Sequence, residues 1–94
     1  MQEYLSLGSI VILKGDIKKV LIVSRGIRIK KDNKTIYYDY GAVFYPEGLI
    51  HGNLLYFNHD VIDVVISKGY TDESESKIQR ILNANTYASN TREV

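Results

Sequence analysis

The sequence predicts a mainly β domain of the α+β class: a small bent antiparallel sheet or SH3-like half-barrel, followed by one C-terminal helix. Three observations predict this class. Short β-branched runs alternate with glycine, asparagine and aspartate turns as far as Gly69. The first two runs are apolar on both faces, which is typical of strands that are covered on both sides. A polar segment with one narrow apolar stripe follows and indicates a helix.

The first part of the chain predicts two consecutive hairpins. The apolar runs 10–13 and 20–23, joined by the turn at 14–16, form the first one. After Ser24, apolar and basic residues alternate, which predicts a half-buried strand that extends beyond the body of the domain. The second turn is centred on Asp32-Asn33, because both residues tolerate the left-handed backbone of a tight hairpin.

The return strand is predicted at 35–44, with Gly41 as a bulge or bend. The Tyr-Pro-Glu-Gly sequence at 45–48 predicts a type I turn with proline at its second position. The sheet is completed by a short strand at 54–57, one helical turn starting at 58–60 and a final strand at 64–66.

The C-terminal helix is predicted at about 72–84, within a single domain that spans 1–84. Thr71 or Asp72 supplies its N-cap, and Asp72 with Glu75 has the capping-box spacing. The apolar stripe, which we expect to pack on the sheet, is formed by Ile78, Ile81 and Leu82. Residues 85–94 are predicted to be a polar, flexible tail.

The composition limits the function before any motif is considered. With 94 residues, 45% of them apolar, the chain can build one core. The lack of cysteine leaves no disulfide and no Cys-based metal site. No apolar run approaches the roughly 20 residues of a membrane span, and the N-terminus lacks a signal-peptide pattern. We therefore expect a soluble cytoplasmic protein without a cofactor.

The net charge of +1 conceals an uneven distribution of charge along the chain. Up to Thr35 there are eight basic and three acidic residues, whereas from Ile36 onward there are four basic and eight acidic. Such a split either steers a charged partner or keeps exposed strands soluble.

No residue set in the chain predicts a catalytic centre. The two histidines, His51 and His59, have Asp60 and Asp63 nearby and suggest a metal or acid–base site. Metal sites usually need three or more ligands at compatible spacing, and His59 belongs to a capping pattern that explains it locally. Because no nucleophile–base pair and no glycine-rich phosphate loop is present, we expect a protein that is not an enzyme.

The candidate binding surface is the basic second hairpin with the tyrosine-rich strand that follows it. Exposed tyrosines and a free strand edge suit a protein partner, or a second copy paired through a strand edge. Basic residues beside aromatic rings also suit nucleic acid, although the acidic second half of the chain disfavours a phosphate backbone. We expect protein contacts through Arg25, Arg28, Lys30, Tyr37 and Tyr45, with nucleic-acid binding as the alternative.

Several short blocks of residues occur in an order that is similar to a known family. They are Leu7-Gly8-Ser9, Lys14-Gly15, Tyr38-Asp39-Tyr40, Tyr45-Pro46-Glu47-Gly48, Phe57-Asn58-His59 and Gly69-Tyr70. The chain thereby resembles a small uncharacterised family of Gram-positive bacteria, encoded in type VII (ESX/Ess) secretion loci beside LXG-type toxins. The resemblance implies a cytoplasmic accessory role, as a chaperone or targeting factor of a secreted toxin. It transfers no catalytic residue, and the motif residues serve either the fold or binding.

Overall fold

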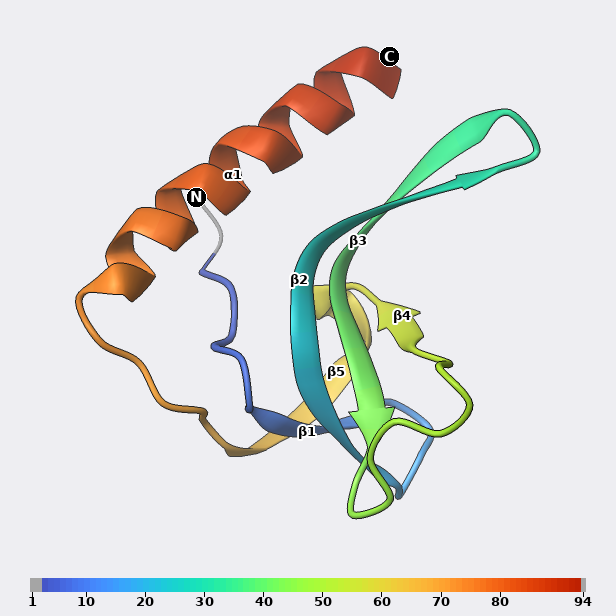
Figure 1. Ribbon diagram of the computed structural model, residues 1–94, viewed down its shortest axis with the longest axis vertical. Coiled ribbons are helices and arrows are strands. Elements are labelled where there is room, and N and C mark those ends of the chain that lie inside the picture. Colours follow the sequence, from blue (N-terminus) through green and yellow to red (C-terminus); the bar gives the residue numbers. More distant parts are fainter. Residues whose placement is uncertain (1–2, 94) are drawn as a thin grey trace.

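Five strands form one bent antiparallel sheet in the computed structural model, which describes residues 3–93, with side chains as far as residue 84. The elements are β1 (Ile10–Leu13), β2 (Lys19–Lys31), β3 (Lys34–Phe44), β4 (Leu55–Phe57), the 3-10 turn η1 (His59–Val61), β5 (Ile62–Ser67) and α1 (Ser74–Glu93). The strand order is β4-β3-β2-β1-β5, and every pairing is antiparallel. Figure 1 shows this sheet beside α1. The predicted fold class, mainly β with a helix near the C-terminus, is confirmed.

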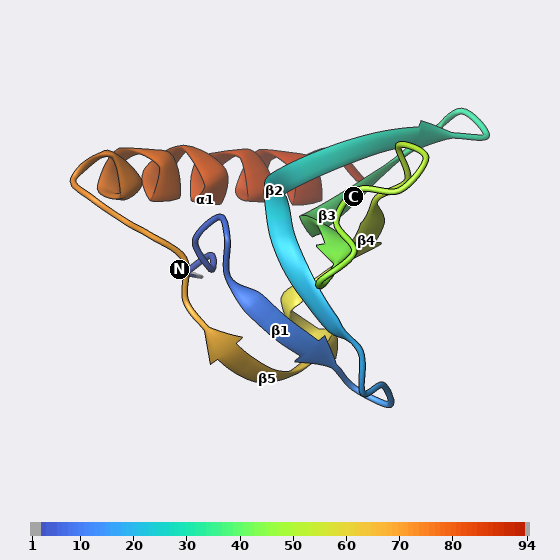
Figure 2. The ribbon, with the colours of Figure 1, turned by 60° about the horizontal axis from the view of Figure 1, so that its bottom comes forward.

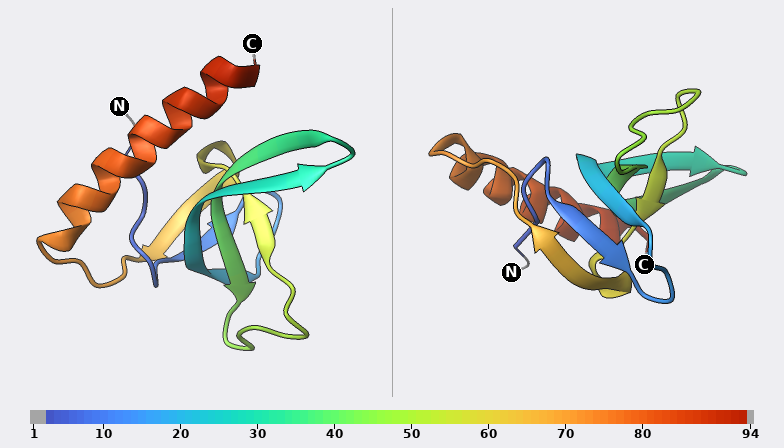
Figure 3. Two further views of the ribbon diagram at one scale, coloured as in Figure 1. Left: turned by 45° about the horizontal axis from the view of Figure 1, so that its top comes forward. Right: turned by 90° about the horizontal axis from the view of Figure 1, so that it is seen from below.

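The hairpin of β2 and β3 is the longest part of the sheet: β3 matches the predicted return strand within one residue, and β2 joins the apolar run at 20–23 to the predicted extension after Ser24 in one strand. Its outer part stands away from the body of the domain in Figures 1 and 3, and we call residues 27–38 the arm. At the tip of the arm Asp32 and Asn33 both have positive φ, as predicted. The register of β2 shifts by one residue opposite Gly41, where the sequence predicts a bulge.

Gly26 lies where β2 bends beneath the helix. Its φ is +60°, and a Cβ atom on this residue would lie 2.7 Å from Cδ2 of Leu82. Glycine adopts this backbone conformation without a steric penalty and leaves room for the leucine. The bend therefore brings the middle of β2 into direct contact with α1.

The core lies between the two halves of the bent sheet and the helix. Figure 2 shows α1 above, β1 and β5 below, and β2 running from one to the other. The buried cluster consists of Tyr4, Val11, Val20, Ile22, Tyr40, Ala42, Phe57 and Leu82. Of the predicted apolar stripe on the helix, Leu82 is buried and Ile78 packs partly against the core, whereas Ile81 is 45% exposed.

Helix α1 has the predicted Asp72 cap at its start but extends past its predicted end. It begins at Ser74, because the Asp72 carboxylate accepts a hydrogen bond of 2.9 Å from the Ser74 backbone N–H and caps the first turn. The Glu75 carboxylate, expected to complete a capping box, binds Arg25 instead. The helix continues to Glu93, past the predicted end at residue 84.

The prediction of a polar, flexible tail at 85–94 stays a prediction. The backbone of 85–93 belongs to α1, and the side chains of this segment lie outside the described residues. Within the described part of the chain, no helix has both the length and the apolar character needed to cross a membrane. The single helical turn predicted after β4 is η1, and β4 and β5 start within two residues of the predicted strands.

The segment before β1 lies between α1 and the sheet and joins them by hydrogen bonds that the sequence did not predict. The Tyr4 backbone N–H donates to Oε1 of Gln79 at 2.9 Å, and Nε2 of Gln79 donates to the Tyr4 carbonyl at 2.7 Å. Further along, the Ser6 hydroxyl donates to the carbonyl of Gly69 at 3.0 Å. A Cβ atom on Gly69 would lie 1.9 Å from the Leu7 carbonyl oxygen, so only glycine fits this contact.

Two tight turns connect β3 to β4, where the sequence predicted one turn and a loop. The Tyr45–Pro46 peptide bond is cis. The Gly48 backbone N–H donates to the Phe44 carbonyl at 2.7 Å and closes the turn predicted at 45–48. A β-bridge joins Phe44 to Gly48 across this first turn. A bridge between Ile50 and Asn53 closes the second turn, whose two central residues have positive φ.

Candidate protein-binding surface

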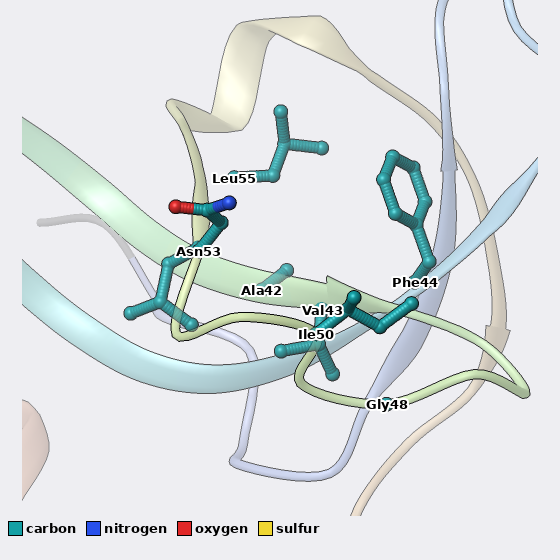
Figure 4. Close-up of a pocket in the computed structure, with 8 residues that line it drawn as sticks. Ala42, Val43, Phe44, Gly48, Ile50, Asn53 and Leu55 are labelled. Carbon is teal, nitrogen blue, oxygen red and sulfur yellow. The ribbon is translucent and has the colours of Figure 1, made fainter.

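An apolar pocket of about 320 Å³ opens between the end of β3, the two turns and the start of β4. Its lining residues are Ala42, Val43, Phe44, Gly48, Ile50, Asn53, Leu54 and Leu55. Figure 4 shows Phe44, Ile50 and Leu55 arranged around Ala42, with the Asn53 amide as the polar group of the lining. Strand alternation places Ala42 and Phe44 on the same face of β3. The pocket has the size and the apolar lining of small ligand-binding sites.

Exposed apolar side chains line this pocket or are next in sequence to residues that line it. Leu49 is 61% exposed, and we call it, with Phe44, Tyr45, Ile50 and Leu55, the apolar rim. The other four residues of the rim are each between 36% and 47% exposed. Contiguous exposed apolar surface on a small domain usually marks an interaction site. The rim and the pocket together are therefore the strongest candidate for a functional surface.

Polar contacts hold the first turn against the turn between β1 and β2. Nζ of Lys18 lies 2.7 Å from Oε2 of Glu47, and this ammonium holds the pKa of the Glu47 carboxyl below its usual range. The Tyr45 backbone N–H donates to the carbonyl of Lys19 at 2.9 Å. The ion pair is exposed, so it adds little stability. Together the two contacts join the first turn to the turn between β1 and β2.

The structure separates the two tyrosines that the sequence predicts as contacts. Tyr45 is exposed on the rim. Tyr37 is half-buried, and its hydroxyl is hydrogen-bonded to the hydroxyl of Tyr4 in the segment before β1. Tyr38 stacks on Tyr56 of β4, with ring centroids 5.7 Å apart. Tyr45 therefore suits an interface, whereas Tyr37 takes part in internal packing.

Arg25 lies inside the molecule and not on the surface where the sequence predicts it. Its side chain is 9% exposed, and its guanidinium pairs with Glu75 of α1, with 2.5 Å between Nη1 and Oε2. The cause is the bend at Gly26, which turns the adjacent arginine toward the helix. The guanidinium lowers the pKa of the Glu75 carboxyl. Arg28 and Lys30, the other two basic residues of the prediction, are exposed on the arm.

The two histidines have separate surroundings. His51 is exposed in the centre of the second turn, with a φ of +55°. His59 is half-buried, and its Nε2 lies 2.7 Å from the Tyr40 hydroxyl. Burial lowers the pKa of the His59 imidazole. Among the described residues, no group of three His, Asp or Glu side chains is placed to hold a metal ion.

Two of the sequence blocks that carry the resemblance hold the fold together. The Asp39 backbone N–H donates to Oδ1 of Asn58, and Oδ2 of Asp39 accepts the backbone N–H of His59, both at 2.8 Å. The Tyr40 hydroxyl accepts the backbone N–H of Leu5 at 2.8 Å. These bonds tie β3 to the 3-10 turn and to the N-terminal segment. The block at 45–48, in contrast, lies at the surface beside the pocket.

Fold and surface together define a class: a small β-rich domain that presents a preformed apolar pocket between two ordered turns. The chain belongs to the family described as Domain of unknown function (DUF4176), whose model matches residues 4–78. This match confirms the coarser part of the resemblance, an uncharacterised family. Comparison with curated proteins and with solved structures found no match to this chain.

Proposed function

We propose that this chain is a non-catalytic module that binds another protein. The observation that carries the proposal is the preformed pocket of about 320 Å³ with its apolar rim. An apolar side chain of the partner fills the pocket, and the rim excludes water around it. Central, well-packed anchors of this kind supply most of the binding energy of protein interfaces.

The resemblance to proteins of type VII secretion loci supports a more specific role. We take the partner to be a secreted LXG-type toxin or another product of such a locus. In the cytoplasm the module covers an apolar segment of the toxin before export, as a chaperone, or presents that segment to the secretion machinery, as a targeting factor. Both roles need an exposed apolar surface that is ordered in advance, and the rim has this property.

Co-purification with each neighbouring gene product, followed by calorimetry, tests this proposal. Tyr45→Ala and Leu49→Asp are expected to weaken binding at least about tenfold, because loss of a central interface side chain costs about 2 kcal/mol. Tyr70→Ala is the matched control, since Tyr70 is 82% exposed and belongs to the segment between β5 and α1. Figure 1 shows this segment away from the two turns. Unchanged affinity in both rim variants would show that the partner binds elsewhere.

Nucleic-acid binding by the arm is the second candidate. Lys30, Lys31 and Lys34 are exposed at the tip, and the same hairpin carries Tyr38 in its stack with Tyr56. Lysines neutralise phosphates, and aromatic rings stack on bases. A gel-shift titration decides this: submicromolar binding of single-stranded DNA that survives physiological salt would favour the second candidate. No binding at low salt would remove it.

A further inference from the structure

An apolar band runs along one face of the arm. Ile27 pairs with Tyr38, and Ile29 pairs with Ile36. Directly opposed residues of antiparallel strands share a face, so these four side chains form one apolar strip. At the inner end of the strip, Tyr38 stacks on Tyr56 of the neighbouring strand β4. The strip therefore continues from the arm onto the body of the sheet.

Leu54 connects this band to the pocket. Gly41 has no side chain, and the position of its missing Cβ lies 2.7 Å from Cδ1 of Ile27 and 3.6 Å from Cδ1 of Leu54. Leu54 is also part of the pocket lining. Ile36 and Tyr56 are 38% and 37% exposed, so part of the band is open to solvent. A partner that fills the pocket thus meets further apolar surface in the direction of the arm.

The far end of the band is positively charged. Lys31 and Lys34 pair with each other and continue the face of the strip, whereas Lys30 pairs with Thr35 on the other face. All three lysines are exposed at the tip, and Asp32 is the acidic residue beside them. The two ion pairs of the described side chains, Lys18–Glu47 and Arg25–Glu75, involve none of these lysines. Lys34 is eight positions before Ala42 of the pocket in the same strand, which is roughly 25 Å along a strand. The surface is therefore apolar at one end and cationic at the other.

We propose that the partner segment that fills the pocket also runs along the arm and carries aspartates or glutamates opposite the tip lysines. The inference rests on the proposed function and specifies the chemistry of the partner: an apolar anchor, with acidic residues roughly 25 Å away. Complementary charge at the rim of an interface speeds association and selects one orientation. The arm thereby fixes the direction in which the segment lies on the sheet.

The test compares two triple variants that change the net charge equally. The arm variant is Lys30→Glu/Lys31→Glu/Lys34→Glu, and the control is Lys14→Glu/Lys68→Glu/Lys77→Glu, three exposed lysines outside the arm. The probe is the LXG-type toxin of the same locus, measured by calorimetry and stopped-flow at low and physiological salt. We expect the arm variant to lose roughly tenfold in affinity, mainly in association rate, and the control about twofold at most. The difference in affinity between the arm variant and the control should become smaller as the salt concentration increases.

Each other outcome decides against the inference. Equal affinity of the two triple variants would overturn it, and the proposed function would still stand if Tyr45→Ala weakens binding. Failure of the wild-type chain to bind the toxin or any other product of the locus would overturn both. An oligothymidylate of about 15 nucleotides that binds more tightly than the toxin, and is lost only in the arm variant, would assign the arm to nucleic acid. Circular dichroism melting of both variants shows that the fold is retained.

Discussion

The tyrosines at the centre of the chain have different surroundings, and these decide what each side chain does. Tyr40 is fully buried, its hydroxyl meets Leu5 and His59, and burial raises the pKa of its phenol above the ordinary value. Tyr37 is half-buried against Tyr4. Tyr45 remains exposed beside the pocket. One residue type thus supplies a core side chain, an internal hydrogen bond and a surface contact within nine positions of the chain.

Substitutions at two of these tyrosines should separate stability from binding. Tyr37→Phe removes one hydrogen-bonding hydroxyl and should lower the free energy of unfolding by about 1 kcal/mol. Tyr45→Ala alters an exposed position and should change the free energy of unfolding by no more than about 0.5 kcal/mol. Urea titrations of the two variants and the wild type measure both values. A larger loss in Tyr45→Ala than in Tyr37→Phe would place Tyr45 in the core and exclude it from the interface.

His59 should make the domain less stable in mild acid. Burial lowers the pKa of His59 in the folded state, whereas in the unfolded chain it is about 6.5. Between the folded pKa and about 6.5 the unfolded state binds more protons, so the free energy of unfolding falls as the pH falls through this range. Above about pH 7 the imidazole is neutral in both states, so His59 no longer makes the free energy of unfolding depend on pH.

Urea unfolding at neutral and mildly acidic pH measures this dependence in the wild type, His59→Gln and His51→Gln. The dependence should be smaller in His59→Gln and unchanged in His51→Gln, because His51 is exposed in a turn. An equal change in the free energy of unfolding with pH in all three proteins would show that His59 does not cause the pH dependence.

At the scale of elements, the attachment of α1 decides the shape of the domain. Leu82 packs at Gly26 where β2 bends, and Glu75 pairs with Arg25 one position earlier on the same strand. Gln79 lies between them in the helix and binds the backbone of Tyr4. Three positions on one side of the helix thus fasten both β2 and the N-terminal segment.

Leu82→Ala should destabilise the domain by about 2 kcal/mol or more, because it removes a buried side chain and leaves a cavity at the bend. The neighbouring Ile81→Ala is the control, since Ile81 is 45% exposed, and its cost should be clearly smaller. Thermal melting and urea titration of both variants give the comparison. Equal costs would mean that the helix packs through a different face.

At the scale of the whole molecule, the bent sheet needs the helix to close its core. The sheet leaves Tyr40 to be covered by Tyr4 of the N-terminal segment, and α1 holds that segment in place. The two turns with the pocket and the arm both remain clear of the helix (Figure 3). Under the proposed function, the contacts that stabilise the fold and the surface that binds a partner are therefore separate parts of the molecule.

Truncation before Thr71 should unfold or aggregate the domain, because it removes Leu82, Gln79 and the partner of Arg25 together. An unpaired buried guanidinium adds a further cost. Deletion of residues 85–94 is the control, since it keeps all of these contacts. Circular dichroism and analytical ultracentrifugation measure both truncations. An unchanged melting temperature on truncation before Thr71 would show that the helix is free to serve a partner.

Local chain chemistry determined the elements of this protein. The apolar periodicity gave the strands and the helix, and the left-handed tolerance of Asp32-Asn33 placed the tip of the arm. Likewise Gly41 marked the bulge, because a glycine in a strand breaks the alternation. The exposed tyrosine at 45 and the proline turn beside it were also visible as a candidate surface. Each of these features depends on residues that are close together in sequence.

The tertiary structure decided the rest, since it depends on residues far apart in the chain. Arg25 pairs with a carboxylate 50 positions away, and Gln79 binds a backbone 75 positions away, so neither role leaves a local pattern. The pocket forms only when two turns fold against the end of β3. The band that joins it to the arm depends on cross-strand register and on the missing side chain of Gly41. Local preferences select each element, whereas packing between elements determines which side chains remain exposed for a partner.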